Sequence, residues 1–99
     1  MPFVIFEVKT PDIAKIQDLL KDDITSRQSI VIRDAKALGI KEDVTYVQIE
    51  GSIEGVKHAE AVAKELGFAT VPEKKAKEIN DKITQEEKEA ATGMGMIFD

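Results

Sequence analysis

The feature that most constrains this chain is the spacing of its apolar residues, which alternates between the period of strands and the period of helices. Residues 3–9 (FVIFEVK) are mostly β-branched or aromatic and predict a strand. A Thr10-Pro11-Asp12 helix start follows, and isoleucine and leucine then recur at helical spacing, so we expect a helix that ends near Asp23. The pattern then repeats, which predicts a sheet backed by helices.

Residues 29–40 admit two interpretations. Ile30, Val31 and Ile32 favour a strand, whereas Val31, Ala35 and Leu38 would share one face of a helix. We favour a strand from about Ile30 to Ala35, because three consecutive β-branched residues are poor helix formers. A helix here would remove one strand from the predicted sheet.

Glycine and proline divide the rest of the chain. We expect a strand over 44–50, a helix over 53–66, a short strand over 68–71 and a third helix opening at Pro72. The sequence Thr84-Gln85-Glu86-Glu87 resembles a capping box and predicts a break and restart in that last helix. The tail after it is apolar and interrupted by Gly93 and Gly95, which suggests either a short edge strand or a segment that docks onto a partner.

This order predicts an α+β fold, a two-layer ferredoxin-like (βαββαβ) sandwich with a C-terminal helix and the option of a short final strand. We treat residues 1–99 as one domain, with 72–91 as a C-terminal helical extension and 92–99 as a tail. Right-handed crossovers would place the first two helices on one face of the sheet.

Charge and composition exclude several classes of function. The net charge of −5 disfavours nucleic acid as a partner. The chain has no cysteine, which excludes disulfides, thiolate nucleophiles and iron–sulfur clusters. No leader and no apolar stretch of membrane-spanning length is visible, so we expect a cytoplasmic protein without a membrane partner. We also expect neither a cofactor nor a metal.

The N-terminus provides one enzymatic alternative. Removal of Met1 would leave Pro2 as an N-terminal secondary amine at the start of the first strand. The start Pro2-Phe3-Val4-Ile5 resembles that of the tautomerase superfamily, and the likeness extends loosely to residues 37–40 and to the strand at 44–49. The resemblance implies that Pro2 is a general base, with Arg27 or Arg33 to hold a carboxylate substrate. Residues 30–32 depart from the family, because they fit its long helix badly.

A second alternative lies where the strand at 44–50 joins the next helix. Backbone N–H groups at Gly51, Ser52 and Gly55 could hold an anion or another small molecule, which would make the protein a sensor. The other interpretation is a capped turn in which the glycines ease the bend. Glu54 and His58 share one face of this helix, but a single histidine without cysteine is a poor basis for a metal site.

The function we expect is that of a non-catalytic binding or regulatory module that acts through self-association or a protein partner. No convincing catalytic group emerges from the sequence, so we lean against an enzyme. A ferredoxin-like sheet has one open face, and an apolar patch there would seek a partner unless the third helix covers it. The predicted interface residues come from that face and from the tail: Phe3, Ile5, Tyr46, Met96 and Phe98.

Overall fold

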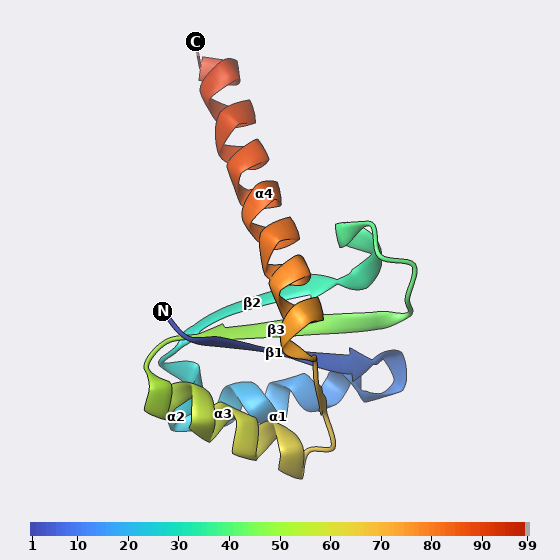
Figure 1. Ribbon diagram of the computed structural model, residues 1–99, viewed down its shortest axis with the longest axis vertical. Helices are drawn as coiled ribbons and strands as arrows, with labels where there is room; N and C mark the ends of the chain where they lie inside the picture. Colours follow the sequence, from blue (N-terminus) through green and yellow to red (C-terminus); the bar gives the residue numbers. More distant parts are fainter. Residues whose placement is uncertain (99) are drawn as a thin grey trace.

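The computed structural model describes the backbone of residues 1–98 and the side chains of residues 1–88. Its centre is one four-stranded sheet (Figure 1). The strands are β1 (Phe3–Lys9), β2 (Ser29–Asp34), β3 (Val44–Glu50) and β4 (Ala69–Thr70). They lie in the order β2-β3-β1-β4, and every neighbouring pair is antiparallel. The predicted α+β class is therefore confirmed.

Helices cover one face of this sheet. They are the short η1 (Thr10–Lys15), α1 (Ile16–Lys21) and α2 (Asp23–Ser26), and the longer α3 (Ile53–Glu65). The core between these helices and the sheet contains Phe6 and Val47 from the strands, Leu19 from α1 and Ala59 from α3. Gly67 ends the α3 segment with a positive φ of 84°, a conformation that glycine adopts without strain.

The opposite face of the sheet is covered by α4 (Glu73–Phe98) and by the short η2 (Ala35–Leu38). Ala76, Ile79 and Ile83 of α4 pack there on Ile5 and Tyr46, both of which are fully buried. Figure 1 shows α4 crossing the strands at a steep angle and continuing beyond β2, away from the rest of the chain. The molecule therefore has two cores, one on each face of a single sheet.

The ambiguous segment at residues 29–40 is a strand followed by a short helix. β2 covers Ser29–Asp34, and η2 begins at Ala35, where the side chain of Asp34 caps it by accepting from the Lys36 N–H. The strand preference inferred from three consecutive β-branched residues is confirmed, and the alternative of one continuous helix is wrong.

The first helical segment differs from the prediction. It divides into η1, α1 and α2. The break between α1 and α2 arises because Asp22 adopts an extended backbone conformation and caps α2 by accepting from the Thr25 N–H. Thr10 does not cap a helix. Its hydroxyl donates to the backbone oxygen and the carboxylate of Asp43, and thereby ties the end of β1 to the loop before β3.

The predicted break at Thr84 is wrong, because α4 is one helix of 26 residues. Ile83 stays packed on the sheet, and the glutamine and glutamates after Thr84 are good helix formers, so nothing favours a new start there. The optional final strand is also wrong, since residues 93–98 continue the helix. Beyond β2 the helix has left the sheet, so no described strand lies beside the tail.

Candidate functional site

Three polar contacts fix the path of α4 across the sheet. Lys75 Nζ lies 3.6 Å from Glu7 Oε1 on β1. The amide of Gln48 on β3, a buried side chain, donates to Asn80 Oδ1 at 2.6 Å. Arg33 Nε on β2 donates to Glu86 Oε1 at 3.0 Å. The helix therefore crosses β1, then β3, then β2, and Glu86 makes its last polar contact with the sheet among the described side chains.

The first turns of α4 also close a charged cluster around Tyr46. The Tyr46 hydroxyl donates to Glu42 Oε2 at 2.7 Å, and Lys75 Nζ donates to the same oxygen at 2.9 Å. Burial, with Glu42 as a second cause, raises the pKa of Tyr46 to about 12. The hydrogen bond from Tyr46 lowers the pKa of Glu42, and the bond to Glu42 raises the pKa of Lys75. A phenol held protonated in this way suits a structural donor rather than a catalytic base.

β2 forms an open edge of the sheet, on the side that α4 crosses last. Gly51 N–H donates to the Pro2 oxygen, so these two residues form a hydrogen-bonded pair next to the β1–β3 ladder. Hydrogen-bonded pairs alternate along antiparallel strands, so in β2 the residues that bond to β3 are Ser29, Val31 and Arg33. The backbone groups of Ile30 and Ile32 therefore point away from β3, toward the free side. Arg33 Nη1 donates to the Ile32 oxygen at 2.9 Å, and no described strand pairs with β2 on this side. The side chain of Ile32 is 38% exposed. A run of β-branched residues therefore lies at an unpaired edge.

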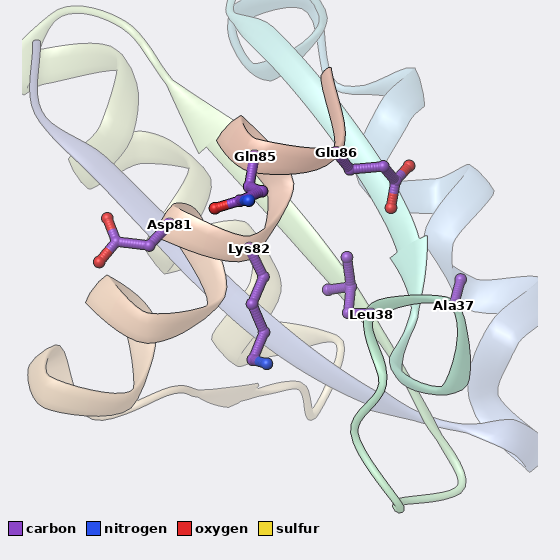
Figure 2. Close-up of a pocket in the computed structure, with 6 residues that line it drawn as sticks. All are labelled: Ala37, Leu38, Asp81, Lys82, Gln85 and Glu86. Carbon is purple, nitrogen blue, oxygen red and sulfur yellow. The ribbon is translucent and has the colours of Figure 1, made fainter. Parts of the chain in front are cut away.

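Two clefts flank α4. The smaller has a volume of about 380 Å³ and is lined by Ala37 and Leu38 of η2 and by Asp81, Lys82, Gln85 and Glu86 of α4. Figure 2 shows that Asp81 and Glu86 point to opposite sides of α4, so the charged groups do not converge on one point. The cleft lacks the convergent polar groups that orient a small ligand.

The larger cleft, which we call the Pro2 pocket, has a volume of about 950 Å³. It lies between the N-terminal half of β1, the end of β4 and the first turns of α4. Its apolar lining includes Pro2, Phe3, Ile5, Val71 and Ala76, and the amide of Asn80 is among its polar groups. Because β4 pairs only with Phe6 and Glu7 of β1, the sheet is narrow at this end and leaves the space open.

Pro2 lines this pocket, but neither candidate arginine does. Arg33 lies in register with Tyr46 and Glu7, so it is about five residues, or roughly 17 Å, along the strands from Pro2. It pairs with Glu86, and Arg27 pairs with Asp23 at 2.9 Å on an exposed surface. The structure therefore does not assemble Pro2 with a carboxylate-binding arginine.

The turn at Gly51, Ser52 and Gly55 is occupied by a side chain of this protein. Ser52 Oγ accepts from the Gly55 N–H at 3.0 Å, as an ordinary helix cap. The side chain of Gln28 lies against both glycines so closely that a Cβ on either would collide with it, and its amide donates to the Ile24 oxygen. Gln28 fills the space that an anion would need, and no local sequence signal pointed to it.

His58 contacts Asp22 rather than Glu54. Its Nε2 lies 2.8 Å from Asp22 Oδ2, a close contact rather than an aligned hydrogen bond. The N–H and hydroxyl of Thr25 donate to the same oxygen at 3.0 and 2.9 Å. The backbone bond from Thr25, then the neighbouring His58, lowers the pKa of Asp22 to about 2. Among the described residues, no three potential metal ligands lie together.

The predicted interface residues lie in different places. Ile5 and Tyr46 are buried beneath α4, and Phe3 is half-buried at the Pro2 pocket. Met96 and Phe98 belong to the last turns of α4, and their side chains lie outside the described part of the structure.

No family model, curated protein or solved structure matches this chain significantly. Within residues 1–98, no helix has both the length and the apolar character needed to cross a bilayer. The function must therefore be inferred from geometry. The features that the described residues leave open are the β2 edge, the Pro2 pocket and the path of α4 beyond β2.

Proposed function

We propose that this protein is a non-catalytic interaction module that acts by associating with a second copy of itself. The observation that carries the proposal is the path of α4, which crosses β1, β3 and β2 and then continues past the edge of the sheet. About twelve residues, or roughly 18 Å of helix, extend beyond Glu86. We call residues 87–98 the α4 overhang.

A helix of this length is not stable by itself in water, because most helical stability in proteins comes from packing one face on something else. The α4 overhang also contains Gly93 and Gly95, each of which costs about 1 kcal/mol relative to alanine inside a helix. Its sequence includes Ala90, Met94 and Ile97, so it is apolar enough to pack. A helix of this composition gains stability from a covering surface, and β2 is the last strand of the described sheet on this side.

The β2 edge supports the same proposal. An unpaired strand edge is a template for another strand, and proteins that avoid such pairing usually place proline, lysine or a bulge there. β2 has no proline, lysine or bulge, and its charged residues, Arg33 and Asp34, lie at its end, after Ile30, Val31 and Ile32. The edge and the α4 overhang are adjacent, since Glu86 contacts Arg33 of β2. One partner could therefore satisfy both.

We also propose that the fold is of the ferredoxin-like type. The strand order β2-β3-β1-β4 supports this, as does the position of α1 and α3 on one face, where they connect β1 to β2 and β3 to β4. A fold of this type serves many roles, so the proposed self-association is argued from the β2 edge and the α4 overhang and not from the fold. The tautomerase alternative gains no support without an arginine near Pro2, and the sensor alternative gains none while Gln28 fills the turn.

Sedimentation equilibrium over a wide range of concentration tests the proposal. We expect the intact protein to sediment as a dimer, and Ile32→Lys to weaken association at least tenfold, about 1.4 kcal/mol, because it places a charge at the paired edge. Ile13→Lys is the matched control, since Ile13 is 42% exposed and lies in η1, away from β2. A monomer at every concentration would overturn the proposal.

A further inference from the structure

We infer that the Pro2 pocket is the binding site for the α4 overhang of a second copy, in a two-fold dimer whose β2 strands pair antiparallel about Val31. The inference rests on the proposed self-association and specifies its geometry. It joins three features of the molecule: the β2 edge, which no described strand pairs with, the α4 overhang and the Pro2 pocket.

The hydrogen-bond pattern restricts how two β2 strands can pair. The backbone groups of Ile30 and Ile32 face the open edge, whereas those of Val31 face β3. In an antiparallel ladder, residues opposite one another must both face the partner or both face away. The two-fold axis must therefore lie at a residue that faces its own copy on the second strand, and not midway between two residues. Near the middle of β2 the possible positions are Ile30, Val31 and Ile32.

The position of α4 selects among these three. An axis at Ile30 would separate the two copies of α4 by about four residues of strand, roughly 13 Å, which is more than the 8–10 Å at which packed helices lie. Residues that lie opposite one another across the strands form rows, and Ile32 shares a row with Val47 and Phe6. The contacts of α4 with Glu7, Gln48 and Arg33 fall in the two rows beside this one, so the helix is centred over the row of Ile32. An axis at Ile32 would therefore superimpose the two copies of α4.

An axis at Val31 avoids both conflicts. It pairs Ile30 with Ile32 of the second copy, a cross-strand contact between β-branched residues that covers the exposed Ile32 side chain. It displaces the two α4 helices by about two residues of strand, roughly 7 Å. That separation is close to the 8–10 Å at which packed helices lie, so the two helices would run antiparallel and side by side.

The same axis directs the α4 overhang to the Pro2 pocket. Val31 lies in the same row as Ile5, which is one row nearer to Phe3 than the row that α4 follows. A two-fold axis at Val31 therefore places the helix of the second copy on the Phe3 side of α4, and not over η2. Strands are about 4.8 Å apart, and the overhang of roughly 18 Å therefore spans β2 and β3 of the second copy and reaches its β1. The pocket lies at that position, beside the N-terminal half of β1.

The sequence of the overhang agrees with packing on a sheet. Ala76 and Ile83, which pack on the sheet of their own chain, are followed at the same seven-residue spacing by Ala90 and Ile97. A seven-residue repeat keeps apolar positions on one side of a helix. The stripe that covers one copy of the sheet thus continues, in sequence, along the part that would cover the other.

Single-cysteine variants test the register, because the chain has no native cysteine. Residues opposite one another at a non-hydrogen-bonded position have Cα atoms about 4.5 Å apart, within the range of a disulfide. We expect Val31→Cys to form a covalent dimer on mild oxidation at least tenfold faster than Ile30→Cys or Ile32→Cys. Circular dichroism of each variant checks that it is folded. Faster cross-linking of either neighbour would overturn the register.

A second measurement tests the pocket. A chain with Phe3→Cys is mixed with a chain with Ile97→Cys, and a short bismaleimide is added; we expect a mixed covalent dimer in clear excess over either homodimer. Phe68→Cys, which lies on the opposite face of the sheet, replaces Phe3→Cys as the control. A sedimenting dimer without the mixed product would overturn this inference and leave self-association standing, whereas a monomer would overturn both.

Discussion

Asp22 provides the clearest prediction of pH dependence. Its carboxylate accepts two bonds from Thr25 and lies beside His58, which joins the α1–α2 junction to α3. These contacts lower the pKa of Asp22 from 3.8 to about 2. A folded pKa below the unfolded one means that the unfolded chain binds the proton more tightly. The stabilisation is therefore fully present above pH 3.8 and is lost as the pH falls through about 2.

The size of this stabilisation follows from the shift. One pKa unit corresponds to 1.36 kcal/mol, so a shift of this size corresponds to a little over 2 kcal/mol. A quarter of the Asp22 side chain is exposed, and solvent screens part of the effect. We therefore expect Asp22→Asn to lower the free energy of unfolding by about 1–2 kcal/mol at pH 7. The difference from the original protein should shrink toward pH 2.

Urea unfolding of both proteins at pH 7, 4 and 2.5 measures this difference. Asp23→Asn is the control, because the Asp23 side chain is 77% exposed and its pair with Arg27 lies on the surface, so we expect a change below about 0.5 kcal/mol. A destabilisation by Asp22→Asn that is equally large at pH 7 and pH 2.5 would refute the reasoning, since it would then arise from packing and not from the charge.

Three further predictions concern packing, and chemical denaturation measures each. Asn80→Ala should cost about 1–3 kcal/mol, because it leaves the buried amide of Gln48 without its acceptor; no measurable loss would mean that water replaces Asn80. Ile79→Ala should cost about 2–5 kcal/mol, whereas Ile53→Ala, at a side chain that is 62% exposed, should cost less than about 0.5 kcal/mol; equal losses would contradict the described α4 core. Gly55→Ala should be neutral or destabilising by up to about 1 kcal/mol, because its Cβ displaces the Gln28 side chain. In a Gln28→Ala background the same change should stabilise the protein by roughly 0.5–1 kcal/mol, because alanine favours the helix more than glycine does. The same sign in both backgrounds would disprove the contact.

The strands and the main helices could be predicted from local sequence. The strand at β2 followed from three β-branched residues, and α3 followed from its Ser52 cap, its apolar stripe and Gly67. The break between α1 and α2 could not be predicted from local sequence, because it depends on Asp22 capping α2. An aspartate within an apolar helical pattern can equally lie inside one continuous helix. The expectation that Thr10 starts a helix as its cap is wrong for a similar reason. Its actual partner, Asp43, is far away in the sequence.

The candidate site was less predictable than the fold. The sequence predicts a third helix from Pro72, but it does not show whether that helix covers the sheet, since this depends on the chain reversing after β4. The blocking of the Gly51 turn by Gln28 is a contact between separate elements, and no motif encodes it. The path of α4 past β2 is a matter of direction in space. A hydrophobic pattern gives the face of a helix and not the angle at which it crosses a sheet.

The two cores of the sheet also have a consequence for biosynthesis. Residues 3–71 contain all four strands and every helix of the first core, whereas the second core needs residues 73–86. During translation, Ile5 and Tyr46 therefore remain in contact with water until most of the chain has left the ribosome. A nascent chain at that stage exposes an apolar sheet face together with an open strand edge, a combination that makes partly folded chains prone to aggregation. Once the first four turns of α4 have emerged they cover the sheet face, and only the β2 edge stays open.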